Sequence, residues 1–317
     1  MAEIQQKPIN QQNEEIVKVN NSKVFIDFII QVITVIAFCL PGVLIRILLL
    51  NLTSKHEIFI QNSDFLPNSV GSFVMGIFQS PDFKSEFSLM HLGITVGFCG
   101  SLTTFSSWII GILVKQENKY IAVDIICGII LPLIFVYMGR KLADIAYFSR
   151  KKQKIINLPQ QQIEANTQIK KNIYYEIAVI VFIIIFEIIG FSIAFSSYFD
   201  LNYLYEILFG PVGALPRYIM STKLNNLISC FQLGTFLSNW FGTIIAFILE
   251  VTCIQKSICY QIQFGSMGSL STVSSWANDT INNFEKNKFR SLLYNLGTFG
   301  VCIVSAIIVN EISKIKN

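Results

Sequence analysis

Two short hydroxyl-rich strings are the residues of this sequence best suited to do chemistry. GSLTTFSSW at 100–108 lies inside a long apolar segment, and a close copy, GSLSTVSSW, follows at 268–276. Polar groups in hydrocarbon cost free energy unless they are paired or line something wet. Gly-Ser-Leu-Thr-Thr also has weak helix propensity, and its hydroxyls compete for backbone hydrogen bonds. The strings therefore predict two broken membrane helices, one of them at 99–104, whose freed carbonyls could enclose a cation.

Other kinds of site have no candidate in the sequence. His56 and His91 lack a Cys or carboxylate at ligand spacing, which argues against a transition-metal site. No nucleophile stands with a base and no P-loop is present, so neither an enzyme nor a primary pump is expected, and nothing points to a nucleic-acid partner. The seven scattered cysteines are interpreted as small packing residues rather than a disulfide framework.

Composition indicates a polytopic membrane protein. The 317 residues are 52% hydrophobic and 14% charged, with a mean hydropathy of +0.55, whereas soluble domains are about 25% charged. Several apolar runs are about 20 residues long, enough to cross a bilayer. Residues 1–22 have no apolar core, so they are predicted to be a disordered cytoplasmic tail and not a signal peptide.

The hydroxyl-rich string is one of three blocks that occur twice in the same order. LPGVLIRILL (40–49) is answered by VGALPRYIMS (212–221), which pairs Arg46 with Arg217. FLPNSVGSFVMGIF (65–78) is answered by FLSNWFGTIIAFIL (236–249), which pairs Asn68 with Asn239. The offset is 171 residues in these blocks and 168 in the third. The chain is therefore interpreted as a tandem duplication of a unit of about 115 residues.

The duplicated units predict an all-α membrane fold with nine transmembrane helices. Each unit supplies four spans, and one unrepeated apolar run (174–195) lies between them. The spans are 23–50, 64–80, 88–113 and 120–139, then 202–221, 232–250, 261–276 and 291–312. An odd linker span makes the second unit enter from the opposite side, so the repeats are expected to be inverted. The predicted organisation is a tail (1–22), a first four-helix repeat (23–139), a basic cytoplasmic loop (140–172), a linker helix (173–198) and a second four-helix repeat (199–317).

Charge predicts the orientation of these spans. They leave 16 Lys and Arg on the side of the N-terminus and 6 on the other, which favours a cytoplasmic N-terminus and an external C-terminus. Half of the Lys and Arg residues on the side of the N-terminus lie in the loop 140–172. This loop is interpreted as a topology determinant, with lipid binding as the alternative.

In its repeated blocks the sequence resembles the Fluc/FEX fluoride channels. The residues that carry the resemblance follow the pattern R…NxxG[ST]F…GxxG[GS]LTTFS[ST][FW] in the first unit, and the second unit keeps it in part, with Val273 in place of the aromatic residue. Small members of that family have four spans and pair antiparallel, and its eukaryotic exporters fuse two units through an extra span. The resemblance implies a passive fluoride-selective channel in the plasma membrane, acting as a monomeric fused pseudo-dimer.

The resemblance also implies site residues. A structural, central Na⁺ would be held by backbone carbonyls of Gly100, Thr103, Gly268 and Ser271. The fluoride pore would be lined by Asn68, Thr104, Phe105, Trp108, Asn239, Thr272 and Trp276. These types suit an anion, because aromatic edges are positive and amides and hydroxyls can replace hydrating water. Arg46 and Arg217 are expected to anchor the interface, with anion steering as the alternative, and a fourth-span position falls near Asp124 and near Asn295 or Thr298.

Some features leave alternatives open. Val273 stands where an aromatic residue is expected, so we predict that a pore built around Phe105 conducts while the pore with Val273 is degenerate. Trp108 and Trp276 can also be explained by packing alone, and the glycines by close helix approach. Glu187 invites a rival function, a proton-coupled exporter of the small multidrug resistance type, but it lies in the unrepeated segment. An interaction protein without transport leaves the duplicated string unexplained.

Overall fold

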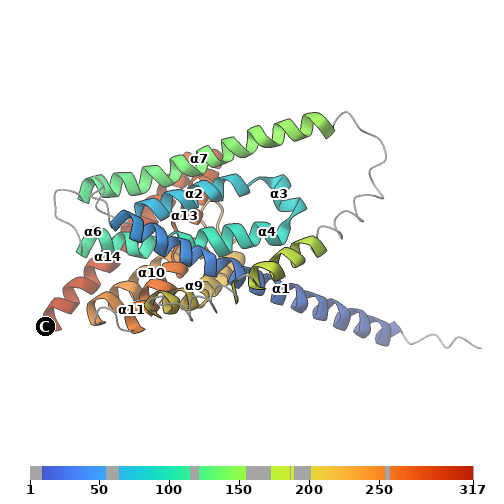
Figure 1. Cartoon of the computed structure of the whole chain (residues 1–317), viewed down its shortest axis with the longest axis horizontal. Helices are drawn as coiled ribbons and strands as arrows, with labels where there is room; N and C mark the ends of the chain where they lie inside the picture. The colour runs from blue at the N-terminus through green and yellow to red at the C-terminus, as the bar shows by residue number, and fades with distance from the viewer. Residues whose placement is uncertain are drawn as a thin grey trace, which may run out of the picture.

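The computed structural model describes residues 9–54, 64–114, 121–154, 173–185, 187–188, 201–253 and 258–316. All regular secondary structure in these residues is helical, as predicted (Figure 1). The first half contains α1 (Ile9–Ser54), α2 (Phe65–Phe78), α3 (Pro81–Glu86), α4 (Ser88–Leu92), η1 (Gly93–Cys99), α5 (Gly100–Leu102), α6 (Phe105–Val114) and α7 (Ile121–Lys154).

A short apolar helix, Ile173–Ile185, represents the predicted linker span. The second half contains α9 (Leu201–Leu224), α10 (Leu233–Thr252), α11 (Ile258–Ile262), η3 (Gln263–Met267), α12 (Gly268–Leu270), α13 (Val273–Lys286) and α14 (Lys288–Lys316). The element order of the first half thus returns in the second, with the helices either side of each break in matching places.

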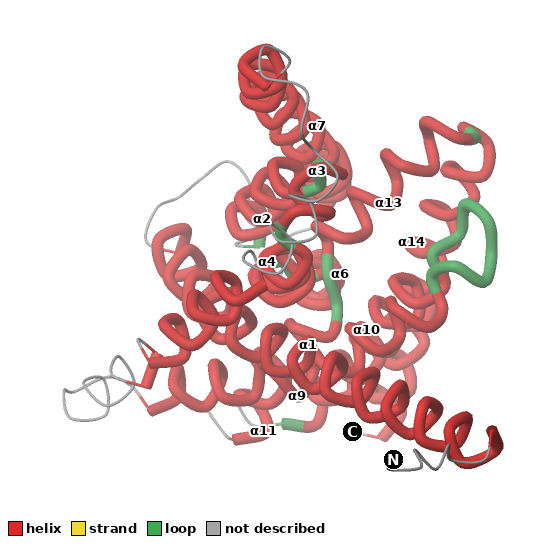
Figure 2. The backbone as a smooth tube through the Cα atoms, turned by 90° about the vertical axis from the view of Figure 1, so that its right-hand side faces the viewer, coloured by secondary structure: helices red, strands yellow, loops and turns green. Residues whose placement is uncertain are grey.

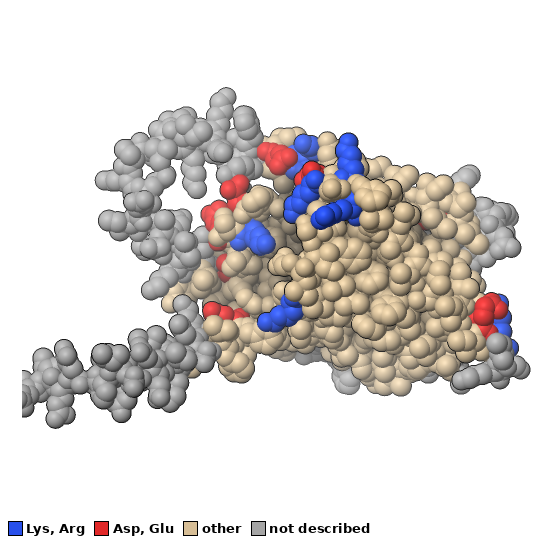
Figure 3. Space-filling model, turned by 180° about the vertical axis from the view of Figure 1, so that it is seen from behind, with Lys and Arg blue, Asp and Glu red and all other residues tan. Residues whose placement is uncertain are grey.

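Five helices of the described chain are long and apolar enough to cross a membrane. They are Val24–Thr53, Ser88–Val114, Ile121–Ala146, Leu233–Thr252 and Lys288–Lys314. Only 17% of the apolar window of Ile121–Ala146 and 22% of that of Lys288–Lys314 is buried, so these helices present apolar surface outward. Figure 3 shows a broad face without charged residues. Such a surface is typical of contact with lipid, and the chain is a multi-pass membrane protein.

Two helices extend beyond their predicted ends. α1 begins at Ile9, inside the segment predicted to be a disordered tail, and α7 continues through Arg140 to Lys154, inside the predicted loop. The extension of α1 contains Gln and Glu and that of α7 is rich in Lys and Arg; these residues are good helix formers and let a membrane helix continue into water. Residues 1–8 of the predicted tail, 155–172 of the predicted loop, and 186 and 189–198 of the predicted linker lie outside the described residues.

The helices of the two halves interlock (Figure 2). α1 packs against α9, α6 of the first half packs on α10, and α13 of the second half packs on α2 and α7. One core cluster joins α6, α13 and α14 through Phe105, Trp276 and Phe299, and another joins α1 to α9. Each half therefore contributes the helix after its break to the other half.

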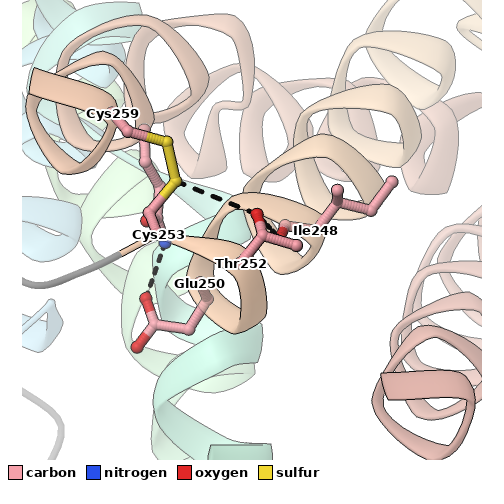
Figure 4. The surroundings of a disulfide bond; sticks show 6 residues. Ile248, Glu250, Thr252, Cys253 and Cys259 are labelled. Carbon is pink, nitrogen blue, oxygen red and sulfur yellow. Dashed lines mark hydrogen bonds between the residues drawn. A yellow bond between two sulfur atoms is a disulfide. The ribbon is translucent and has the colours of Figure 1, made fainter. Parts of the chain in front are cut away.

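Cys253 and Cys259 form a disulfide between the end of α10 and the start of α11, with a Cα–Cα distance of 5.9 Å (Figure 4). The interpretation of all seven cysteines as packing residues is wrong for this pair, because the end of α10 and the start of α11 lie close enough to join the two side chains. Cys39, Cys99 and Cys302 are free and buried, as that interpretation expects.

Candidate functional site: a seam between two helix breaks

Both hydroxyl-rich strings interrupt their helices. α5 ends at Leu102, and Thr103 is extended with φ −97° and ψ 145°. α12 ends at Leu270, and Ser271 is extended with φ −89° and ψ 152°. Thr103 and Ser271 are fully buried. Each break therefore exposes backbone polar groups in the interior, where they must find other partners.

The two breaks satisfy each other. The Thr103 hydroxyl accepts a hydrogen bond from the Ser274 N–H (3.1 Å), in the first turn of α13. The Ser271 hydroxyl accepts one from the Ser106 N–H (3.0 Å), in the first turn of α6. Each hydroxyl thus caps a helix of the opposite repeat, where the first-turn N–H groups have no partner inside the helix. The two contacts are related by the 168-residue offset, so the breaks meet as a symmetric pair.

The predicted pore asparagines fasten the extended residues after the breaks. Asn68 accepts from the Thr104 N–H (2.9 Å) and donates to the Thr104 carbonyl (3.2 Å). Asn239 does the same with Thr272, at 2.7 and 3.2 Å. Each amide group has two N–H donors, so one remains for another acceptor. The hydroxyls of Thr104 and Thr272 accept from Ser107 and Ser275, which caps the following helix of their own repeat.

Arg46 and Arg217 cross the seam. Arg46 donates to the carbonyls of Ser101 (2.9 Å) and Phe264 (2.5 Å). Arg217 donates to the carbonyls of Ser269 (2.7 Å) and Val96 (2.8 Å), which are the equivalent positions. Each guanidinium, only 2% and 1% exposed, therefore binds one carbonyl of each repeat, and these contacts are those of an anchor.

The glycines before the breaks make room for these guanidinium groups. A Cβ on Gly100 would lie 1.7 Å from Nη1 of Arg217, and a Cβ on Gly268 would lie 2.6 Å from Nη1 of Arg46. No side chain larger than hydrogen fits at Gly100 without moving a buried cation.

The breaks leave carbonyls without the amide partner that a continuous helix provides. Thr104 N–H donates to Asn68 and not back to Gly100, and Ser107 N–H donates to the Thr104 hydroxyl and not to Thr103. The second break repeats this pattern at the equivalent positions. The carbonyls freed in this way are those of Gly100, Thr103, Gly268 and Ser271. Such oxygens are suitable ligands for a small hard cation, so the residues present fit the predicted Na⁺.

Aromatic rings from both repeats form one cluster beside the seam. Phe299 of α14 lies 5.1 Å from Phe105, 5.0 Å from Trp108 and 5.2 Å from Trp276, between ring centroids. Phe105 is also edge-on to Trp108 (5.5 Å) and Trp276 (6.2 Å). The structure thus brings together three predicted residues and Phe299, which the sequence did not single out because the fourth spans share no recognisable block.

A small cavity of about 10 Å³ lies in the first repeat, about the size that one water molecule needs. It is lined by Phe65, Asn68, Ser69, Trp108, Asp124, Cys127, Gly128 and Pro132. Asp124, the predicted fourth-span residue, is 2% exposed there, so a carboxyl group borders this cavity.

The burial pattern relates α7 to α14 at an offset of 170 residues. Three of the four buried positions of α7, Asp124, Pro132 and Val136, correspond to the buried Tyr294, Cys302 and Ala306. Asp124 therefore has Tyr294 as its counterpart, and not Asn295, whose side chain accepts from the Thr280 hydroxyl (2.9 Å). Thr298, the other predicted candidate, is buried and falls opposite Gly128. The fully buried phenol of Tyr294 was missed by the sequence reasoning.

The two linker carboxylates have different surroundings. Glu176 is 1% exposed and accepts from the Met90 N–H at the start of α4 (2.7 Å), which fastens the linker helix to the first repeat. Glu187 is half-buried on the linker segment.

The sequence is similar to one known family and to individual relatives over most of its length. The model of the CrcB-like protein family, Camphor Resistance (CrcB), matches it twice, over residues 33–140 and 204–309. The chain is 24% identical to Fluoride export protein 1 of Candida albicans over 311 residues, 84% of this chain and 76% of that protein. It is 22% identical to Fluoride export protein 2 of Saccharomyces cerevisiae, over 84% of this chain and 88% of that protein.

A shorter relative matches a region about as long as one repeat. The Fluoride-specific ion channel FluC of Shewanella denitrificans is 31% identical over 108 residues, 32% of this chain and 87% of that protein. No solved structure matches the chain. The resemblance seen in the repeated blocks is confirmed by the two family matches, and the chain belongs to the CrcB-like protein family.

Proposed function

We propose that this protein is a passive, fluoride-selective channel that exports F⁻, built as nine membrane helices in two inverted repeats. The observation that carries the proposal is the seam, where the break of each repeat caps the following helix of the other. A reciprocal contact of this kind is expected of two units related by a two-fold axis in the membrane plane. The names of the relatives, fluoride export proteins and fluoride channels, supply the ion.

The acid chemistry of HF explains why an open anion path is enough to export fluoride. Neutral HF crosses lipid, ionises in a neutral cytoplasm and is trapped there as fluoride. With the inside of the membrane negative, an anion path lets fluoride leave without coupling energy. This is transport and not enzyme chemistry, and a single chain carries both halves of the seam.

We infer two pathways of unequal chemistry, one beside each set of packed helices. The first pathway would run between α2, α7 and α13, where Asp124 borders the cavity and Val273 begins α13. The second pathway lies between α10, α14 and α6 and contains Phe105 and the hydroxyls of Tyr294 and Thr298. A carboxylate repels an anion, whereas hydroxyls and ring edges can replace its water. The second pathway is therefore the conducting one.

A Na⁺ held by the freed carbonyls at the seam is part of the proposal. The ion would join the two breaks, while the buried charges of Arg46 and Arg217 oppose it. Sodium is therefore expected to raise the unfolding temperature of the purified protein above its value in N-methylglucamine buffer of equal ionic strength. Equal unfolding temperatures across a wide range of sodium concentrations would argue against the ion.

The proposed location is the plasma membrane, with the N-terminus in the cytoplasm. The positive charge bias supports this orientation. The Cys253–Cys259 disulfide supports it as well, because both cysteines fall on the predicted external side, where disulfides persist. Labelling of Cys230, in a turn on the predicted cytoplasmic side, by an impermeant maleimide on intact cells would contradict it.

Fluoride efflux from liposomes containing the purified protein tests the function. Liposomes loaded with fluoride are expected to lose it through the protein. Liposomes loaded with chloride are expected to show no more efflux than protein-free vesicles. Chloride efflux at the fluoride rate would refute selectivity. Efflux of cationic drugs driven by a proton gradient, with no fluoride efflux, would favour the exporter based on Glu187.

A further inference from the structure

The turn between α13 and α14 forms an exposed tip that is rich in positive charge. All seven residues from 284 to 290, FEKNKFR, are exposed, and we call this segment the basic tip. Its one acidic residue, Glu285, is paired with Arg140 of α7 (3.4 Å). The tip also has three cations, none of which forms an ion pair with a described residue: Lys286, Lys288 and Arg290. The basic tip therefore presents positive charge that the described chain does not compensate.

The single residue between the two helices gives the basic tip a defined shape. The N–H of Asn287 donates to the Asn283 carbonyl (2.7 Å), which closes the last turn of α13. The Asn287 side chain accepts from the Arg290 N–H (3.0 Å), which caps the first turn of α14. The cations are thus carried by ordered helix ends, so an anion that binds there need not pay for ordering the backbone.

The basic tip lies at the edge of the lipid-facing surface. Phe289 is 68% exposed, and exposed apolar residues continue from it along α14 at Leu292 and Leu296. Phe284, near the end of α13, is 54% exposed, and the ammonium of Lys288 lies 5.4 Å from the centre of its ring. On the face in Figure 3, most Lys and Arg side chains gather toward one end of the broad uncharged surface. Apolar rings beside basic side chains are typical of the boundary between hydrocarbon and headgroups.

Helix stability and topology do not account for these residues. Lys288 and Arg290 lie in the first turn of α14, which has no acidic residue and where positive charge disfavours a helix. An excess of positive charge on the cytoplasmic side sets the orientation of a membrane protein, but it does not require exposed phenylalanines beside the charges. An anion that has an apolar part matches both features.

We propose that the basic tip binds an anionic phospholipid of the cytoplasmic leaflet, with its three cations on the phosphate and Phe289 against the acyl chains. Charge-assisted hydrogen bonds from ammonium and guanidinium groups suit phosphate oxygens. Each cation near an anionic membrane surface adds roughly fivefold in affinity. The bound lipid fastens α13 and α14, the two helices that follow the second break, to the membrane surface. The choice of leaflet rests on the proposed orientation, and the binding itself does not depend on the transported ion.

Native mass spectrometry of the full chain in detergent, with equal amounts of phosphatidylserine and phosphatidylcholine added, tests the proposal. The wild type should retain phosphatidylserine in preference to phosphatidylcholine. The ratio of bound phosphatidylserine to phosphatidylcholine should fall by about tenfold or more in a triple variant of the tip, Lys286→Gln, Lys288→Gln and Arg290→Gln. The wild-type ratio should persist in a matched control that removes the same charge from the predicted external side, Lys256→Gln, Lys314→Gln and Lys316→Gln.

Two further measurements separate a lipid from a free phosphate. Phe289→Ser keeps every charge and should lower the retention of phosphatidylserine by about threefold or more, because the ring no longer covers the acyl chains. Soluble glycerophosphoserine has the same headgroup without acyl chains, so a large excess of it should not displace the lipid. Both tip variants should unfold at the wild-type temperature in phosphatidylcholine micelles, since the altered side chains are exposed.

The outcomes bear on the lipid site and on the proposed function separately. Equal ratios in the wild type and the triple tip variant, an equal loss in the external control, or displacement by glycerophosphoserine would each overturn the lipid site. Absence of fluoride efflux from liposomes would overturn the proposed function alone, because lipid retention is measured without ion flux.

Discussion

Replacing Gly100 with alanine is expected to disrupt the assembly of the seam. The new Cβ would lie 1.7 Å from Nη1 of Arg217, and the guanidinium cannot leave without abandoning its buried carbonyls. Overpacking combined with lost hydrogen bonds to a buried cation costs about 3 kcal/mol or more. We expect the unfolding temperature in detergent, measured by intrinsic fluorescence, to fall by about 6 to 12 °C.

Two other glycines calibrate this result. Gly268→Ala makes the equivalent contact at 2.6 Å with Arg46 and should destabilise less. Gly300→Ala meets no heavy atom within 4 Å and should be neutral or slightly stabilising, since alanine favours the helix. An unfolding temperature for Gly100→Ala equal to that of Gly300→Ala would show that Arg217 does not need the space.

Replacing Phe105 with serine is expected to abolish most fluoride efflux, whereas the same change at Val273 should have little effect. Both residues are fully buried and begin the helix after a break, so the pair is well matched. Phe105 contacts Phe299, Trp108 and Trp276, and its ring edge is the feature that suits an anion. Efflux should fall by at least about tenfold for Phe105→Ser, or ~1.4 kcal/mol in the barrier.

The comparison decides between one pathway and two. Efflux of Val273→Ser should stay within about twofold of wild type, because the first pathway then carries no current to lose. Equal losses in the two variants would mean that both pathways conduct. Each variant should first be shown to elute as a single species in detergent, so that efflux reports conduction and not misfolding.

The sequence was sufficient for the features that depend on local chemistry. Gly-Ser-Leu-Thr-Thr predicted the break at Thr103, and its copy predicted the break at Ser271, because hydroxyls and weak helix formers disfavour a continuous helix wherever they occur. The pairing of Arg46 with Arg217 followed from block order alone, and their equivalent contacts agree with it.

Features that depend on the approach of distant helices were not predictable. The capping of α13 by Thr103 joins residues 171 positions apart, and no sequence pattern names that partner. Tyr294 and Phe299 both lie on α14, whose side chains differ from those of α7, so their roles appear only in three dimensions. The disulfide was missed because two cysteines six positions apart have no pairing signal until the end of α10 and the start of α11 are known to lie together.

The exchange of helix caps between the breaks has an evolutionary consequence. A duplicated gene frees each copy to change, but here a substitution at Thr103 or Ser271 is felt first by the opposite copy. Selection must therefore act on the two helix breaks together, while the outer surfaces of either copy can change independently. Divergence confined to the periphery, with a conserved middle, is the pattern that such mutual dependence leaves in a lineage.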